Sequence, residues 1–342
     1  CMDRQFNPKK LTDRPRWLRD LKLVVMCVFG RSVFEPGAQL HNYDDGLKLV
    51  DLLARYNAPA TTLIYAPGAL VRSYDGGLPD YWPRDEQGGE AGFRKFLDHA
   101  HSKGFKVMCE TNPFGVDYVH PLYAKFKAHR TSDAYAAPGS RGYCDCEGDK
   151  LKEFFAYISP CCAEWRKFIV RSHRRLAEKF PIDMILLDQH FQYFNDPNCN
   201  FDEALAMLYG EIARASSPIL LAGESCHERV VGTDVPFSVV NFDLYSSNNR
   251  PPWVKVHPID IELFRDYVVY CGHEGALPSP GHAHTTGWPS DARIAETKMS
   301  FRDQQERNTY LNLVPTLRIT PRLGDLDEET AAIITRAASF KY

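Results

Sequence analysis

Three acidic residues lie at or just beyond the ends of apolar runs in the second half of the chain. Asp188 follows the run 184–187, Glu224 follows the run 218–222, and Asp243 comes after the run 237–240. Carboxyl groups held close together push their pKa values apart, so that one remains protonated as an acid while its neighbour remains an ionised nucleophile. Asp188, Glu224 and Asp243 are therefore the predicted catalytic residues. For Asp188 a second interpretation stays open, in which it only caps the turn that follows.

These acids can meet only if the runs before them are neighbouring strands. Apolar strand-like runs alternate with amphipathic helical stretches along the chain, which is typical of a parallel sheet with crossover helices. We expect an α/β fold, a (β/α)₈ TIM barrel with long βα loops. The carboxyl ends of the strands then converge on one face, where such barrels carry their active sites.

The predicted elements follow from the period of the apolar residues. Strands are expected at 21–29, 61–65, 105–109, 184–187, 218–222, 237–240, 267–271 (with 254–256 as an alternative seventh strand) and 316–319. Helices are expected at about 45–55, 90–103, 163–179, 201–215, 292–313 and 327–338, and the segments 66–89 and 130–160 are expected to be long insertions. Residues 1–20 are expected to form an N-terminal lead-in, and residues 21–342 a single catalytic barrel.

The predicted exit loops combine aromatic rings with polar side chains, although any one of the rings is more often a packing residue. Sugars present flat apolar faces edged by hydroxyl groups, so this mixture favours a carbohydrate. The predicted substrate-binding residues are Tyr65, Tyr81, Trp82, Glu110, Asn112, Asp117, Gln189, His190, Tyr245, His282 and Trp288. No phosphate-binding G-x-x-x-x-G-K-[ST] loop or dinucleotide-binding glycine pattern occurs, so we expect no cofactor.

The composition is that of an ordinary globular protein. The chain has 342 residues, 44% hydrophobic content, 25% charged content and a net charge of −3, so nucleic acid and anionic membranes are not expected partners. No apolar run approaches the roughly 18 residues needed to cross a bilayer, and no leader-like segment opens the chain. We expect a mature form or an excised domain that is secreted or periplasmic rather than cytoplasmic.

The ten cysteines are scattered along the chain. Cys27, Cys109 and Cys271 lie in or beside apolar runs and are expected to be reduced. Structural zinc is not favoured, because the gaps between the other cysteines do not match those of zinc ligand pairs. If the protein is exported, we expect a disulfide among Cys144, Cys146, Cys161, Cys162 and Cys199.

A catalytic metal is the less favoured interpretation of the histidines. His227, His273, Glu274, His282 and His284 could provide ligands, but their spacing matches neither H-x-x-x-H nor H-E-x-x-H. We therefore expect no metal.

The strand ends Ile185-Leu186-Leu187-Asp188 and Leu221-Ala222-Gly223-Glu224 resemble those of the retaining α-glycosidases of the α-amylase type. The resemblance implies Asp188 as the nucleophile and Glu224 as the acid/base. Leu186 stands where that family has arginine, and the His-Asp pair after the seventh strand is missing. A related clan of α-galactosidase-like barrels takes its acid from the sixth strand, which would make Asp243 the proton donor.

Four short segments look more like a less characterised group of bacterial glycoside-hydrolase-like barrels. They are 78–83 (LPDYWP), 104–108 (GFKVM), 111–115 (TNPFG) and 187–189 (LDQ). Together the residues and the resemblance predict a glycoside hydrolase, with retention of configuration, that acts on an oligo- or polysaccharide. The alternatives are a carbohydrate-binding barrel without catalysis and a metal-dependent hydrolase or deacetylase.

Overall fold

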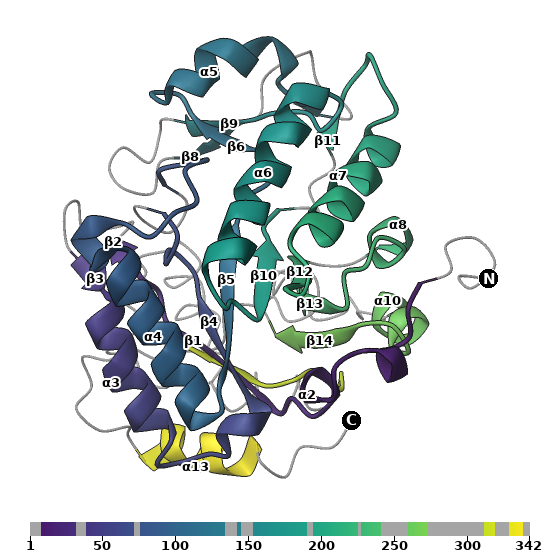
Figure 1. Ribbon diagram of the computed structural model, residues 1–342. Coiled ribbons are helices and arrows are strands. Elements are labelled where there is room, and N and C mark those ends of the chain that lie inside the picture. Colours follow the sequence, from purple (N-terminus) through teal and green to yellow (C-terminus); the bar gives the residue numbers. More distant parts are fainter. Residues whose placement is uncertain are drawn as a thin grey trace, which may run out of the picture.

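The protein is a (β/α)₈-type barrel in which helices surround a parallel sheet (Figure 1). The computed structural model describes residues 8–31, 39–71, 76–133, 142–144, 153–189, 194–224, 227–240, 259–272, 311–318 and 328–337. Within these residues, no helix combines the length and the apolar character needed to span a bilayer.

Eight parallel strands form one sheet in the order β14-β13-β12-β10-β5-β4-β1-β15. Their bounds are β1 (Leu23–Met26), β4 (Thr62–Ala66), β5 (Lys106–Thr111), β10 (Met184–Leu187), β12 (Leu220–Glu224), β13 (Phe237–Val240), β14 (Val269–Gly272) and β15 (Thr316–Arg318). The two outermost strands approach each other through a parallel bridge between Cys271 and Val314, just before β15. This bridge brings the sheet close to a complete ring.

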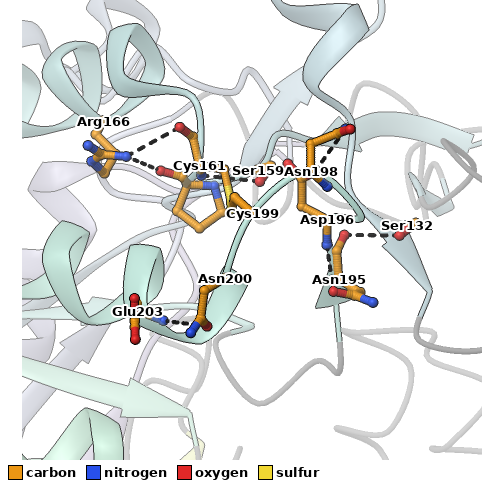
Figure 2. The surroundings of a disulfide bond; sticks show 11 residues. Ser132, Ser159, Cys161, Arg166, Asn195, Asp196, Asn198, Cys199, Asn200 and Glu203 are labelled. Carbon is orange, nitrogen blue, oxygen red and sulfur yellow. Dashed lines mark hydrogen bonds between the residues drawn. A yellow bond between two sulfur atoms is a disulfide. The ribbon is translucent and has the colours of Figure 1, made fainter.

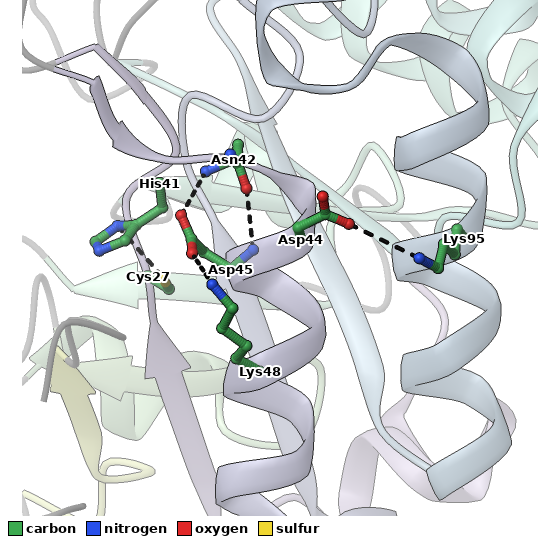
Figure 3. A network of polar contacts seen from close by, with 7 residues as sticks. All are labelled: Cys27, His41, Asn42, Asp44, Asp45, Lys48 and Lys95. Carbon is green, nitrogen blue, oxygen red and sulfur yellow. Dashed lines mark hydrogen bonds and ion pairs between the residues drawn. The ribbon is translucent and has the colours of Figure 1, made fainter. Parts of the chain in front are cut away.

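The outer helices include α3 (Tyr43–Leu53), α4 (Gly89–Lys103), α6 (Ala163–Lys179), α7 (Phe201–Ala215) and α13 (Glu328–Ala337), with the shorter α2 (Arg16–Arg19), α5 (Pro121–Phe126), α8 (Glu228–Val231) and α10 (Ile259–Phe264). Their ends follow from local chemistry. Figure 3 shows α3 beginning with a reciprocal cap, in which Asn42 accepts from the Asp45 N–H and the Asp45 carboxylate accepts from the Asn42 N–H. Helix α4 ends at Gly104, whose φ of 95° is the left-handed conformation that glycine adopts readily.

Alternate residues of each strand enter two separate apolar layers. On β10, Met184 and Leu186 belong to a cluster inside the barrel, while Ile185 and Leu187 belong to the larger cluster between sheet and helices. The inner cluster also holds Met26, Tyr65, Met108, Ala222, Val239 and Cys271. Because a strand has a period of two, these assignments fix which residues beyond each strand point toward the barrel axis.

Three short sheets add to the barrel. They are β2 (Gly30–Arg31) with β3 (Gln39–His41), β7 (Ser132–Asp133) with β11 (Phe194–Asn195), and a three-stranded sheet of β6 (Gly115–Asp117), β9 (Glu153–Tyr157) and β8 (Gly142–Cys144). In Figure 1 the three-stranded sheet and α5 lie together at one end of the barrel, and α2 lies at the other.

The structure confirms the predicted fold class and most of the predicted elements, including the favoured seventh strand. Strand β12 begins and ends two residues later than predicted, so Glu224 is the last residue of the strand. The predicted helix 292–313 is wrong over 311–313, where a turn leads into the bridge at Val314; residues 292–310 lie outside the described residues. Asn312 has a φ of 56° and Pro315 follows closely, and both oppose a helix here.

The disulfide joins Cys161 to Cys199, whose Cα atoms are 6.2 Å apart (Figure 2). It therefore links the residue before the N-cap of α6 to the residue before the N-cap of α7. This confirms a disulfide within the predicted group of cysteines. The thiols of Cys27, Cys109 and Cys271 are reduced and buried, as predicted.

Candidate active site

The strand register brings Asp188 and Glu224 to the same level at the carboxyl end of the barrel. Leu186 pairs with Ala222 on β12, and both side chains lie in the inner cluster. Asp188 and Glu224 are each two residues further along, so they point inward one layer higher. Both are buried, with 8% and 6% of their surface exposed.

The residue after Asp188 contacts Glu224 directly. The backbone N–H of Gln189 donates to Glu224 Oε2 at 3.0 Å. Asn112 Nδ2 donates to Asp188 Oδ2 at 3.1 Å and lies 3.4 Å from Gln189 Oε1. The two predicted acids are thus joined by one polar network.

Glu110 adds a third carboxylate below this layer. It pairs with Leu186 in the β5·β10 register and accepts a short hydrogen bond from the Tyr65 hydroxyl of β4. Burial raises the pKa of Tyr65 well above its ordinary value, and the charges of Glu110, Asp188 and Glu224 raise it further. Tyr65 is therefore a neutral hydroxyl donor beside an acidic cluster.

Backbone contacts fix the orientation of Asn112. Its Oδ1 accepts from the N–H groups of Phe114 and Gly115 at 3.0 and 2.9 Å, so its Nδ2 faces Asp188. Its own N–H donates to the Tyr81 hydroxyl at 3.0 Å, and that hydroxyl donates to the Asn112 carbonyl. Tyr81 therefore holds the backbone of Asn112 through two hydrogen bonds.

A buried histidine supports the strand before Asn112. His173 Nδ1 lies 2.9 Å from the Ile169 carbonyl, which can only accept, so Nδ1 carries the proton. Burial lowers the pKa of His173 to about 4, against a smaller opposing effect of that hydrogen bond. The neutral ring then accepts from the Thr111 hydroxyl through Nε2 at 3.0 Å.

Two predicted substrate-binding residues have other surroundings. The Trp82 indole donates to Glu90 and lies beneath the Arg175 guanidinium, 3.6 Å from the ring centroid, so its contacts are with α4 and α6. Asp117 accepts from the N–H groups of Gly77 and Leu78 at 2.9 and 3.1 Å, and thereby holds the loop after β4. His190, Asp243, Tyr245, His282 and Trp288 lie outside the described residues.

Sequence reasoning missed Tyr157. It lies on β9, and its hydroxyl donates a short hydrogen bond to Gln189 Oε1. The aromatic run 154–157 within the insertion 130–160 is a strand-like signal, but nothing local indicates which loop it contacts.

Within the described residues, one group of side chains has the composition of a metal site. Cys161, Asp196 and Cys199 place one ligand atom each within 4.8 Å of one another. The two sulfur atoms are joined in the disulfide, so this group lacks the thiolates that a metal would need.

Comparison with protein-family models gives no match, and comparison with curated proteins gives none either. Solved structures do resemble the chain. GH36 alpha-galactosidase AgaA from Geobacillus stearothermophilus has a TM-score of 0.60 at 12% identity, over 97% of this chain and 42% of that chain. Alpha-N-acetylgalactosaminidase NagBb from Bifidobacterium bifidum has a TM-score of 0.66 at 14% identity, over 99% of this chain and 55% of that chain.

TtGalA, an alpha-galactosidase from Thermus thermophilus solved with p-nitrophenyl alpha-D-galactopyranoside, has a TM-score of 0.60 at 14% identity, over 97% of this chain and 63% of that chain. The chain therefore has a glycoside-hydrolase-like (β/α)₈ barrel. It spans 42% to 63% of the length of these three structures.

Proposed function

We propose that the protein is a retaining glycoside hydrolase with Asp188 as its nucleophile and Glu224 as its acid/base. The observation that carries the proposal is the 3.0 Å contact between the Gln189 N–H and Glu224 Oε2, because Gln189 directly follows Asp188. Glycoside hydrolysis requires a pair of carboxyl groups beside the bond that breaks. Asp188 and Glu224 are two buried acids at the same end of the barrel. Asp243 is the alternative proton donor implied by the α-galactosidase-like clan.

Strand geometry supports retention over inversion. Neighbouring strands of a sheet lie about 5 Å apart, so the Cα atoms of inward-facing residues at the same level are separated by about that distance. Retaining enzymes hold their carboxyl groups about 5 to 5.5 Å apart, whereas inverting enzymes need roughly 6.5 to 9.5 Å to admit water.

In the proposed reaction, Asp188 attacks the anomeric carbon while Glu224 protonates the glycosidic oxygen. The carbon–oxygen bond breaks, the alcohol leaves, and a glycosyl ester forms on Asp188. Glu224 then takes a proton from water, the resulting oxygen attacks the anomeric carbon, and the ester bond breaks. Asp188 is regenerated as a carboxylate, and Glu224 as an acid.

We propose α-linked glycosides, α-galactosides first, as the substrates to test. A variant of AgaA is solved with raffinose, and TtGalA is solved with stachyose and with an aryl α-galactoside. Those ligands belong to those proteins, and they define the first panel of sugars for this one.

The test is turnover of aryl α- and β-glycosides and of raffinose-type oligosaccharides by purified protein. Asp188→Asn should lower kcat by about 10⁴-fold or more, since it removes the nucleophile. Glu224→Gln should slow substrates with poor leaving groups by about 10² to 10⁴-fold, but should slow activated aryl glycosides less. Asp98→Asn, on the exposed face of α4, is the matched control and should be unchanged.

Several results would contradict the proposal. Binding of sugars without hydrolysis would favour a carbohydrate-binding barrel, and activity abolished by a chelator would favour a metal-dependent hydrolase. Normal turnover in Asp188→Asn would reject the nucleophile. A first product with inverted configuration by NMR would reject the retaining mechanism.

A further inference from the structure

Gln189 has a backbone conformation that asparagine and glycine tolerate better than glutamine. Its φ is 61°, in the left-handed region, and only Asp234 and Asn312 share a positive φ among the non-glycine residues that the structure describes. This conformation is unfavourable for a residue with a Cβ. Such a residue next to a candidate nucleophile calls for a compensating contact.

The compensating contact is the hydrogen bond to Glu224. The left-handed turn directs the Gln189 N–H at Glu224 Oε2, at 3.0 Å. Of the two oxygens of a carboxyl group, the one that accepts a hydrogen bond from an N–H group is the less readily protonated. In the acid form of Glu224 the proton therefore resides on Oε1, and this donor fixes which oxygen serves the leaving group.

The side chain of Gln189 is oriented by contacts other than the backbone hydrogen bond to Glu224. Asn112 Nδ2 must face it, because Asn112 Oδ1 is occupied by two backbone donors. The Tyr157 hydroxyl approaches the same atom of Gln189. That atom is consequently Oε1, and Nε2 has no hydrogen-bond partner among the described residues.

We infer that Gln189 has two roles in the acid pair: its backbone N–H positions Glu224, and its side-chain Nε2 donates to an oxygen of the substrate. The first role makes it a positioning residue, since it acts through Glu224. This inference rests on the proposed function. The two roles separate experimentally, because one depends on the backbone and the other on the amide.

The test compares Gln189→Gly with Gln189→Val. Glycine keeps the left-handed backbone and its N–H but loses the amide, so KM should rise about tenfold while the pH–rate profile stays in place. Valine disfavours a positive φ strongly, so the N–H should leave Glu224. The limb of the profile that depends on Glu224 should then move by about one pH unit toward higher pH, with kcat about 10- to 100-fold lower.

Asn312→Gly and Asn312→Val are the matched controls, because Asn312 is exposed, has a φ of 56° and precedes β15 at its amino end. They should show the loss of stability that valine causes relative to glycine at a positive φ, without moving the pH–rate profile. Equal profiles for Gln189→Gly and Gln189→Val would overturn the positioning role, and an unchanged KM in Gln189→Gly would overturn the substrate contact.

The positioning role stays testable even if no glycoside is hydrolysed, an outcome that would refute the proposed function and, with it, the substrate contact. The Glu224 carboxyl carbon can be titrated by ¹³C NMR and assigned with Glu224→Gln. Its midpoint should be the same in the wild type and Gln189→Gly, and higher in Gln189→Val. A common midpoint in all three would overturn the positioning role.

Discussion

His173 makes the stability of the barrel depend on pH through a single buried side chain. Its pKa is about 4 in the folded protein because burial disfavours the charged ring, against 6.5 for an exposed histidine. The unfolded chain therefore takes up the proton first. The stabilising effect is complete above pH 6.5 and is lost as the pH falls toward 4.

The variant His173→Gln tests this prediction because glutamine does not titrate. Between pH 7 and pH 5 the wild type should lose about 2 kcal/mol of unfolding free energy more than the variant does. Urea unfolding at several pH values measures the difference. Parallel pH dependence in the two proteins would show that His173 is not the titrating group.

Single residues were predictable where the strand pattern determines their direction. Asp188 and Glu224 continue the inward phase of Leu186 and Ala222, so their convergence follows from the sequence once the barrel is assumed. Trp82 was not predictable, because a long loop can carry an aromatic ring to the cleft or to the helix layer. The contact between Tyr157 and Gln189 joins residues 32 positions apart and leaves no local signal.

At the scale of elements, the disulfide anchors the far end of the segment that begins at Asp188. Cys199 precedes α7, and its partner Cys161 precedes α6 (Figure 2). The same segment is held by the β7·β11 pair and by the Ser132 hydroxyl, which donates to the Asn195 carbonyl at 3.1 Å. Loss of the disulfide should therefore loosen the loop without opening the barrel.

Reduction of the disulfide, or Cys199→Ser, should lower the melting temperature. The chain-entropy effect of a 38-residue separation is about 4 kcal/mol, an upper value for the loss. Peptide mapping should recover the 161–199 pair only without reductant. Cys162→Ser, which changes a neighbouring free cysteine, is the control and should leave the response to reductant intact.

Two results would contradict this prediction. A melting temperature that reductant does not change would mean that the bond contributes no stability. Zinc recovered with the reduced protein would mean that Asp196 and the two thiols form a metal site instead.

The accuracy of the element predictions depended on how local their signals are. Helices α6 and α7 have the predicted bounds, because their apolar period is long and ends at clear breaks. The β6-β9-β8 sheet was missed because its strands have three to five residues and pair across a long insertion. Pairing of that kind depends on distant partners rather than on local composition.

At the scale of the whole molecule, we expect the two ends of the barrel to have different roles. The carboxyl end carries the buried acids Asp188 and Glu224. At the amino end, Asp183 precedes β10 and accepts three hydrogen bonds from two elements: from His101 of α4 at 2.7 Å, and from the Lys106 side chain and the Val107 N–H of β5 at 2.8 and 2.9 Å. Barrels of this type place stability at the amino end and chemistry at the carboxyl end.

Asp183→Asn and Asp188→Asn should therefore have opposite effects, although the residues are five positions apart. Burial alone would raise the pKa of Asp183, but the hydrogen bonds from His101, Lys106 and Val107 outweigh it and lower the pKa below 3.8. The stabilising effect of the ionised Asp183 is thus present above about pH 3.8 and is lost as the pH falls through its lower folded pKa.

At pH 6, Asp183→Asn should lose about 2 kcal/mol of unfolding free energy and keep its turnover, whereas Asp188→Asn should keep its stability and lose turnover. The stabilities of wild type and Asp183→Asn should converge as the pH falls below the folded pKa of Asp183. If Asp183→Asn unfolds like the wild type at pH 6, or loses turnover as Asp188→Asn does, the division between the two ends is wrong.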